Sequence, residues 1–410
     1  MFCLHLTFSL LLAATATFAA DWPQWHGPNR DNICTETGLL PQWPADGPPL
    51  AWKATGIGNG FSGVSVVNGK IFTIGDLADG AYVEALDGNG GKLLWKAKLG
   101  NTGGGGGYPG PRATPTVDGD LVYALGQYGD LICVQAADGK EVWRKNMSQD
   151  FGGKMMSGWG YSESVLADGD KLLCTPGGSG GTVAALNKKT GATIWRSTDF
   201  TDNATYSSLL PVDIYGVHQV IVFTDAHVAG VAVDSGKLLW SGTRKGKTAV
   251  IPMPIYKDNC VFVSSGYGIG CNLFKITKTG AEFHAEEAYA NTSMVNHHGG
   301  VILMGDQLYG YSDKGGWTCM DFKTGNVTWV EKKLGKGTIS YADGHFYLRA
   351  ESGPGTLVLI DASPKGWQET GRFDQPDRSG KQSWPHLVIS NDKLFVRDQD
   401  VLLCYDIKKK

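Results

Sequence analysis

Side chains suited to recognition chemistry stand just before apolar β-type runs, or in the turns that join two such runs. They are Arg112, Glu163, Tyr206, Tyr267, His297, His298, Glu351, Trp384, His386 and Arg397. Arg, Glu and His side chains supply charge and hydrogen bonds, and aromatic rings supply flat walls against which a sugar ring or a peptide edge can pack. We find no nucleophile beside a matching base. The pattern therefore predicts a polar funnel with aromatic walls, and it assigns no catalytic residue.

Several of these residues also have structural interpretations. His297 and His298 resemble a pair of metal ligands, but adjacent strand residues point to opposite faces, so we expect no metal site there. Glu163 can act as a base, or it can pair with Arg112 across a central channel. Arg397 precedes two aspartates and can belong to an ion network near the end of the chain. These alternatives remain open at the level of the sequence.

The elements that position these residues come from an internal repeat of roughly 45 residues. A Gly stands four residues before a Trp at Gly91, Gly139, Gly191, Gly236 and Gly325. Each of these Gly residues follows a short apolar run that ends in a turn-forming residue. A strand, a tight turn with positive φ and a second strand carrying a large ring together describe a β-hairpin.

A second hairpin lies upstream in most copies, where Asn-Gly or Asp-Gly separates two apolar runs, as at Asn68-Gly69. One repeat therefore holds four antiparallel strands. In the first complete copy we expect them at Val64–Val67, Lys70–Ile74, Tyr82–Leu86 and Leu93–Ala97.

The spacing of the Trp residues gives the number of repeats. The motif residues are Trp52, Trp95, Trp143, Trp195, Trp240 and Trp329. The wide gap before the last of them holds one degenerate copy near Gly280, and another copy follows near Gly366. The final strands, near Pro385–Ile389, Leu394–Arg397 and Leu402–Tyr405, lack a fourth partner, which Leu50–Lys53 can supply. A linear solenoid would leave both terminal edges open.

We therefore predict an all-β fold, an eight-bladed β-propeller of four-stranded antiparallel blades. Its ring is closed by the N-terminal strand joining the C-terminal blade. The propeller covers residues 49–410, and residues 21–48 form an N-terminal extension that packs on it.

Composition and charge exclude several classes of protein. The chain has 410 residues with 58 Gly, 13 Trp and 19% charged residues, which does not fit a disordered chain. A net charge of −3 gives no basic footprint for a nucleic-acid partner. We expect a monomer with no transmembrane segment.

The first twenty residues are typical of an export signal, with an apolar run and small residues before a cleavage point at Ala19 or Ala20. No Cys stands at that point to carry a lipid anchor. We therefore expect a periplasmic or secreted protein. Six Cys residues lie in apolar runs, where we expect them to be core residues, with a Cys260–Cys271 bridge as an alternative; they are Cys133, Cys174, Cys260, Cys271, Cys319 and Cys404.

The pattern A-x-D-x-x-x-G-x-x-x-W, intact at Ala85–Trp95 and Ala185–Trp195, resembles the repeat of quinoprotein (pyrroloquinoline quinone, PQQ) dehydrogenase propellers. The same repeat occurs in the outer-membrane-assembly propeller lipoprotein. The segments Asp21–Asp31 and Gly110–Pro115 are similar to those of secreted PQQ-like repeat proteins. The resemblance implies that each motif Trp docks between neighbouring blades, but it gives almost no information about the chemistry of the protein.

The same resemblance raises the question of a cofactor. Alcohol-oxidising quinoproteins carry a vicinal Cys-Cys pair against the quinone and a Ca²⁺ site of carboxylate and amide oxygens. No two Cys are adjacent in this chain, and a Cys-x-x-Cys-His haem motif is absent. PQQ with Ca²⁺ is therefore possible but unsupported by a vicinal Cys pair.

The leading hypothesis is a binding or scaffold protein that holds a small molecule, a glycan or a protein partner on the funnel face. A PQQ-dependent oxidoreductase of the alcohol or sugar dehydrogenase type is the alternative. A partner in outer-membrane protein assembly is the third possibility.

Overall fold

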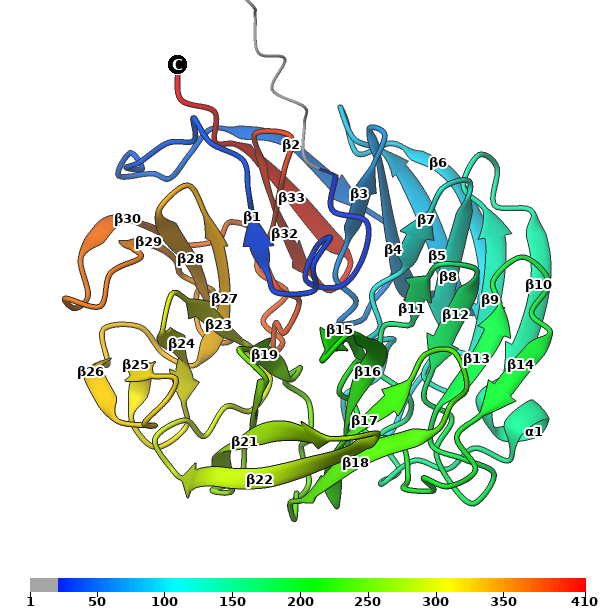
Figure 1. The fold of residues 1–410 in the computed structure, drawn as a ribbon. Coiled ribbons are helices and arrows are strands. Elements are labelled where there is room, and N and C mark those ends of the chain that lie inside the picture. The colour runs from blue at the N-terminus through cyan, green and yellow to red at the C-terminus, as the bar shows by residue number, and fades with distance from the viewer. Residues whose placement is uncertain (1–20) are drawn as a thin grey trace, which may run out of the picture.

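The computed structural model describes residues 21–410, which form eight sheets arranged in a ring (Figure 1). Seven sheets have four antiparallel strands, and the eighth has a further short parallel strand. Within this range one short helix, α1 (Met147–Phe151), is present beside the strands. The predicted eight-bladed β-propeller is confirmed. The predicted export signal lies outside the described residues.

The blades follow one another around the ring in chain order. The first blade consists of β3 (Ser65–Val67), β4 (Lys70–Leu77), β5 (Gly80–Asp87) and β6 (Leu93–Gly100), and the second of β7 (Thr116–Asp118), β8 (Leu121–Leu125), β9 (Asp130–Gln135) and β10 (Glu141–Asn146). The third blade consists of β11 (Leu166–Asp168), β12 (Lys171–Cys174), β13 (Ala184–Asn187) and β14 (Thr193–Arg196), and the fourth of β15 (Leu210–Ile214), β16 (Val217–Phe223), β17 (His227–Ala232) and β18 (Leu238–Thr243).

The other four blades complete the ring. They are β19 (Ile255–Lys257), β20 (Cys260–Ser265), β21 (Gly270–Thr279) and β22 (Glu282–Asn291); β23 (Val301–Met304), β24 (Gln307–Ser312), β25 (Gly316–Asp321) and β26 (Val327–Glu331); β27 (Gly337–Ala342), β28 (His345–Ala350), β29 (Leu357–Asp361) and β30 (Glu369–Phe373), with β1 (Ile33–Cys34) added in parallel; and β31 (Val388–Ser390), β32 (Lys393–Asp398), β33 (Val401–Asp406) and β2 (Leu50–Thr55).

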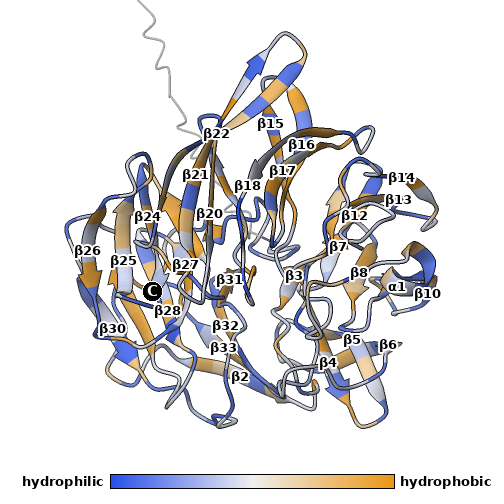
Figure 2. Cartoon of the chain, turned by 90° about the horizontal axis from the view of Figure 1, so that it is seen from below, coloured by the Kyte–Doolittle hydropathy of each residue, from blue (hydrophilic) through white to orange (hydrophobic). Residues whose placement is uncertain are grey.

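The first strand of each blade is the innermost, since β3 and β11 both lie next to β7. The two middle strands are almost wholly buried because neighbouring blades cover both of their faces, whereas the outer strand, such as β6, alternates between buried and exposed residues. Hydrophobic residues accordingly gather on the strands (Figure 2). The turn between β3 and β4 uses Asn68 and Gly69, both with positive φ, as the Asn-Gly signal predicts.

The ring closes through the two ends of the chain. Strand β2 pairs antiparallel with β33, with Trp52 opposite Cys404. The blue and red strands lie side by side in Figure 1. This pairing is the predicted closure, and it satisfies the edge that β33 would otherwise expose.

Five of the six motif Trp residues bond to the following blade through the indole N–H. The accepting carbonyls are Gly88 for Trp52 (3.1 Å), Ala136 for Trp95 (3.1 Å), Lys188 for Trp143 (3.0 Å), Val233 for Trp195 (2.9 Å) and Ser363 for Trp329 (3.3 Å). The exception, Trp240, donates to Gln219 in its own blade at 2.7 Å. The following blade has a long β21–β22 hairpin in place of the short turn. In that blade Tyr289 donates instead to Phe322 of the next blade at 2.9 Å.

The N-terminal segment runs across the central channel and bonds to the inner strands of several blades. Trp22 pairs with Val66 of β3, and the carbonyl of Pro23 accepts from the Val117 amide of β7. Strand β1 then pairs with β27, whose blade is separated from that of β3 by the closing blade alone. This dark-blue segment lies in the middle of the ring in Figure 1. It therefore closes the channel and forms its floor.

The seven cysteines of residues 21–410 are free thiols, so Cys260 and Cys271 form no bridge. Cys260 is half-buried and the other six are buried. No helix among the described residues is long and apolar enough to cross a membrane.

Candidate functional site

A cavity of about 170 Å³ opens where the segments leading into the inner strands converge. Its lining residues come from most of the blades and from the N-terminal segment. They are Trp25, Phe61, Tyr108, Arg112, Trp159, Ser162, Ser164, Tyr206, Ser208, Ile251, Tyr267, His297, His298 and Trp384. A cavity of this size is comparable to the one of 150 Å³ that holds benzene in an engineered protein. The cavity therefore has room for a single ring.

The position of most lining residues follows from the repeat. Phe61, Arg112, Ser208 and Trp384 each stand a few residues before the inner strand of their own blade. Because the inner strands all run in the same direction along the channel, these segments meet on one face. Tyr267 comes instead from the loop between β20 and β21, which lies on the same face.

A chain of hydroxyl groups links the lining segments beneath the cavity. The Gly63 amide donates to Thr114 Oγ1 at 3.2 Å, the Thr114 amide to Ser164 Oγ at 2.9 Å, and the Ser164 amide to Ser208 Oγ at 2.9 Å. Each bond joins one blade to the next. The hydroxyls of Ser164 and Ser208 thus accept from the backbone, and neither hydroxyl hydrogen has an acceptor among residues 21–410. Both hydroxyls can donate into the cavity.

Aromatic rings form the walls. Trp384 stacks on Phe61 with ring centroids 4.3 Å apart, and Tyr108 lies 5.0 Å from Trp384 and 5.7 Å from Trp159. Trp25 lines the cavity from the N-terminal segment, and its ring stacks on that of His26 with centroids 4.1 Å apart. Flat rings at several angles favour a planar occupant, or one with apolar C–H faces.

Arg112 supplies the positive charge of the cavity. Its Nη1 donates to the Trp159 carbonyl at 3.1 Å and its Nη2 to the Tyr108 carbonyl at 2.7 Å. The guanidinium carbon lies 5.7 Å from the Phe61 ring and 5.9 Å from the Trp159 ring. Burial lowers the pKa of Arg112, although Tyr206 and Asp76 oppose the shift electrostatically. No described carboxylate forms an ion pair with Arg112.

His297 and His298 both line the cavity, with ring centroids 4.7 Å apart. The expectation that adjacent residues point to opposite faces is wrong here, because this pair lies in the loop before β23 and not in a strand. His298 Nε2 lies 2.6 Å from Glu351 Oε2, whereas His297 Nδ1 contacts Lys336 Nζ at 2.5 Å.

These contacts set the charge of the histidine pair's surroundings. Burial, together with the nearby His298 and Lys336, lowers the pKa of His297 to about 2, so its imidazole is neutral. Burial raises the pKa of Glu351, but its bond to His298 and the charge of Lys336 outweigh this effect and leave the pKa below its usual value. Glu351 is therefore ionised behind His298 and does not line the cavity. Among the described residues no cluster of three His, Cys, Asp or Glu side chains could hold a metal.

Tyr206 and Tyr267 face the cavity from neighbouring blades. The Tyr206 hydroxyl bonds to Ser157 Oγ, and burial raises the pKa of Tyr206. Tyr267 meets His297 edge to face, with ring centroids 5.0 Å apart. The phenol of Tyr206 is therefore a neutral hydrogen-bonding group at physiological pH.

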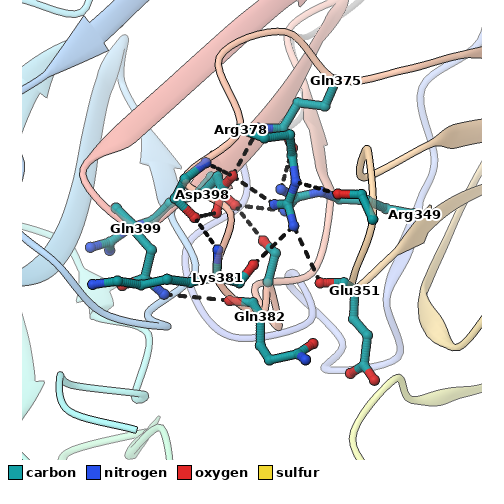
Figure 3. A network of polar contacts seen from close by, with 12 residues as sticks. Arg349, Glu351, Gln375, Arg378, Lys381, Gln382, Asp398 and Gln399 are labelled. Carbon is teal, nitrogen blue, oxygen red and sulfur yellow. Dashed lines mark hydrogen bonds and ion pairs between the residues drawn. The ribbon is translucent and has the colours of Figure 1, made fainter.

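A buried ion pair anchors the loop that carries Trp384 (Figure 3). Arg378 Nη1 lies 2.6 Å from Asp398 Oδ2, and the Ser379 amide donates to the same oxygen at 2.9 Å. Asp398 is fully buried at the end of β32. Figure 3 shows the Glu351 side chain pointing away from this pair. The loop is thus fixed on the last blade while its end reaches the cavity.

Four of the ten predicted residues lie outside the cavity lining: Glu351 stands behind His298, and the other three, Glu163, His386 and Arg397, are buried. Glu163 accepts from the Thr175 amide at 2.5 Å, and its electrostatic partner is Arg30 of the N-terminal segment rather than Arg112. Burial raises the pKa of Glu163 to about 7, because the bonds from Thr175 and the charge of Arg30 offset only part of the desolvation. His386 contacts His26 Nε2 at 3.1 Å below the floor.

Arg397 is the third, and it joins the last blade to the first. Its Nη1 donates to the carbonyls of Ser62 (3.1 Å) and Ile74 (2.8 Å), and its Nη2 to that of Gly58 (3.1 Å). Burial lowers the pKa of Arg397 to about 10. Its partners in these contacts are backbone carbonyls, and the ion pair of Asp398 is with Arg378.

The sequence-based prediction missed half of the wall. Phe61, Trp159 and the serines beside Glu163 stand just before an inner strand, as Arg112 does, so the same positional rule would have included them. Trp25 carried no such signal, because it lies in a segment outside the repeat.

Comparison with known proteins places the chain in a family. A family model described as "Outer membrane protein assembly factor BamB" matches residues 79–331, which is more than half of the chain. The chain belongs to this BamB-type family of PQQ-repeat propellers. A curated relative, the outer membrane protein assembly factor BamB of Shewanella oneidensis, is 26% identical over 259 residues, which are 59% of this chain and 61% of the relative. The match thus spans less than two thirds of that relative.

Solved structures show the same fold at low sequence identity. BamB from Moraxella catarrhalis has a TM-score of 0.59 at 15% identity and covers 84% of this chain and 96% of its own. The quinohemoprotein alcohol dehydrogenase of Comamonas testosteroni has a TM-score of 0.65 at 12% identity, with 95% and 81% covered. At such identity the likeness extends to the fold alone.

The cavity of this BamB-type propeller does not fit a Ca²⁺–PQQ group. Ca²⁺ takes six to eight oxygen ligands, chiefly carboxylates and carbonyls. No Asp, Glu, Asn or Gln side chain lines the cavity.

Proposed function

We propose that this protein is an exported binding propeller that holds a ligand in the funnel-face cavity. One observation carries the proposal: an aromatic-walled cavity of about 170 Å³ contains a half-buried guanidinium with no carboxylate partner among the described residues. A concave, largely apolar site with a few convergent polar groups is the usual form of a small-molecule pocket.

Binding is favoured over catalysis by the chemistry of the lining. Among the described residues, the lining pairs no nucleophile with a base: Ser164 and Ser208 accept from backbone amides, and Ser162 donates to the Gly160 carbonyl. The Glu351 carboxylate behind His298 is engaged by that histidine. General acid–base chemistry requires a group whose pKa lies near the working pH and that reaches the ligand. His297, with its strongly lowered pKa, does not meet that requirement.

Replacement of Trp384 tests the proposal, because this ring forms a wall of the cavity on an anchored loop. Residues 21–410 and the Trp384→Leu variant would be incubated with small-molecule extract from the source cells, desalted, and examined by native mass spectrometry. The Trp367→Leu variant is the matched control, since Trp367 lies on an outer loop and bonds to Glu369 at 3.3 Å. We expect a retained ligand that is lost only with Trp384→Leu. A ligand retained equally by all three proteins, or by none, contradicts the proposal.

A role in outer-membrane protein assembly is the second candidate, and membership of the BamB-type family supports it. A strain that lacks the protein should then contain less of its outer-membrane β-barrel proteins, and the full-length protein should restore them. Unchanged β-barrel levels would rule out this role while leaving the cavity proposal in place.

A further inference from the structure

The side chains around the cavity supply many hydrogen-bond donors and few acceptors. Arg112 keeps N–H groups beyond the two that bind backbone carbonyls. Ser164 and Ser208 have hydroxyl hydrogens without an acceptor in the described part of the chain. Neutral His297 accepts from Lys336 at Nδ1, which leaves its N–H at Nε2. With no carboxylate or amide side chain in the lining, the cavity is matched to an acceptor-rich occupant.

The charge of the cavity also favours an occupant that is rich in hydrogen-bond acceptors. A half-buried guanidinium without a carboxylate is costly, and a bidentate carboxylate is the partner that fits its planar fork. The other positive charge nearby, Lys336, is already matched by Asp313 at 3.1 Å. Arg112 therefore remains available for an incoming anion.

The walls and the size of the cavity restrict the rest of the occupant. Phe61 and Trp384 stack on one another, and the Arg112 guanidinium lies near both the Phe61 and the Trp159 ring. Space for a single ring between such walls favours a flat one, because offset-stacked and edge-to-face contacts both need a planar partner.

We propose that the cavity binds a small aromatic carboxylate, with the carboxylate on Arg112 and the ring between the aromatic walls. This inference rests on the proposed function and names its class of ligand. A neutral sugar fits less well. Each sugar hydroxyl buried in the cavity needs an acceptor for its own hydrogen, and the lining offers no carboxylate or amide for that purpose.

Calorimetric titration of residues 21–410 with four ring compounds tests the inference without any substitution. Benzoate is the probe, benzamide lacks the charge, cyclohexanecarboxylate lacks the planar ring, and glucuronate is an acidic sugar. We expect benzoate to bind at least tenfold more tightly than each of the others. Equal affinity for benzoate and benzamide would show that the negative charge of the ligand does not contribute to binding. Tighter binding of cyclohexanecarboxylate or glucuronate than of benzoate would show that a planar ring is not preferred.

Two Arg variants then locate the charge. Arg112→Gln should reduce benzoate affinity to the benzamide level. Arg196→Gln is the matched control, because Arg196 also donates to two backbone carbonyls and lies over an aromatic ring, Phe151, but away from the cavity. We expect Arg196→Gln to retain full affinity if the variant keeps the wild-type melting temperature. An equal loss in both variants overturns the assignment.

The outcomes separate this inference from the proposed function. If another ring compound binds and Trp384→Leu abolishes its binding, the cavity is a binding site but not one for aromatic carboxylates. If neither these compounds nor any cellular ligand depends on Trp384, both proposals fail.

Discussion

The indole ring of Trp143 covers the place where a Cβ atom on Gly191 would stand, 2.8 Å from Trp143 Cδ2. The two residues belong to successive blades, and the same indole donates to the Lys188 carbonyl. Trp95 and Gly139 have the same relationship. Gly and Trp of the repeat are therefore matched across blades. A blade with the intact motif thus provides a Gly for the ring of the blade before it and a Trp for the blade after it, as expected of a nearest-neighbour repeat.

Gly191→Ala should destabilise the protein more than Gly216→Ala. Both residues have positive φ, 70° and 74°, so both variants carry the backbone cost of about 1 kcal/mol. A Cβ at Gly216 meets nothing within 4 Å, whereas one at Gly191 overlaps the Trp143 ring. We expect a further loss of about 1–3 kcal/mol at Gly191 from overpacking, measured by urea unfolding. Equal losses of stability in the two variants would mean that the Trp143 ring moves aside without an energetic cost.

The repeat made the fold predictable, because strands, turns and docking rings recur at fixed spacing. The path of the N-terminal segment was not predictable in the same way. Its hydrogen bonds, such as those between Trp22 and Val66, join backbone atoms, and such bonds do not require a particular residue type. The exception at Trp240 depends on the length of the hairpin in the following blade, which the local motif does not encode.

The candidate site was predictable in outline only. Arg112 and Trp384 were found because they stand just before inner strands. His297 and His298 were assigned to opposite faces by a rule that holds for strands, and they lie in a loop. Arg397 was placed on the funnel, but its partners, such as Gly58, are more than 300 positions away in the sequence. Contacts across the ring closure are invisible to any local pattern.

His218 should make stability depend on pH in a defined direction. It bridges two blades, with Nε2 at 2.7 Å from Asp168 and Nδ1 at 2.8 Å from Asp213. Burial alone lowers the pKa of His218, but the two carboxylates outweigh it and raise the pKa above its usual value. A pKa that is higher in the folded than in the unfolded protein stabilises fully below about pH 6.5, and the contribution disappears as pH rises through the folded value.

The melting temperature of the wild type should therefore fall relative to His218→Gln between pH 6 and pH 8.5. His284→Gln, at an exposed position on β22, should follow the wild type. A constant difference between His218→Gln and the wild type across this range would contradict the assignment.

Glu84 should make the stability of the protein depend on pH over a lower range than His218 does. It is fully buried, and neither carboxylate oxygen has a hydrogen-bond partner among residues 21–410. Burial raises the pKa of Glu84 to about 7, although the charge of Arg397 opposes the shift. Because the folded protein binds this proton more tightly than the unfolded one, stability is greatest below about pH 4.5 and falls as pH rises to about 7.

The Glu84→Gln variant should unfold at higher urea concentration than the wild type at pH 8, by up to about 3 kcal/mol, and the difference should shrink toward pH 4.5. Glu282→Gln, on the exposed part of β22, is the control and should show no such trend. A Glu84→Gln variant that is less stable than the wild type at pH 8 would show that the carboxylate is needed in its ionised form.

The Arg378–Asp398 pair should hold the loop that presents Trp384. Arg378→Met leaves Asp398 buried without its cation, which typically costs about 3–5 kcal/mol. The loss should appear first as faster amide hydrogen exchange in residues 376–384, since Ser379 and Arg378 both bond to the Asp398 carboxylate. Arg372→Met is the control, because the Arg372–Glu369 pair is partly exposed at the surface, where such pairs contribute at most about 1 kcal/mol.

Exchange in that loop and ligand retention should change together. If Arg378→Met exposes the loop amides and Trp384 is the wall that we propose, the variant should retain less ligand than Arg372→Met under conditions in which both proteins are fully folded. Faster exchange with unchanged ligand retention would show that Trp384 keeps its place through its contacts with the other walls, such as Phe61 and Tyr108. Unchanged exchange in residues 376–384 would show that the buried ion pair does not anchor the loop.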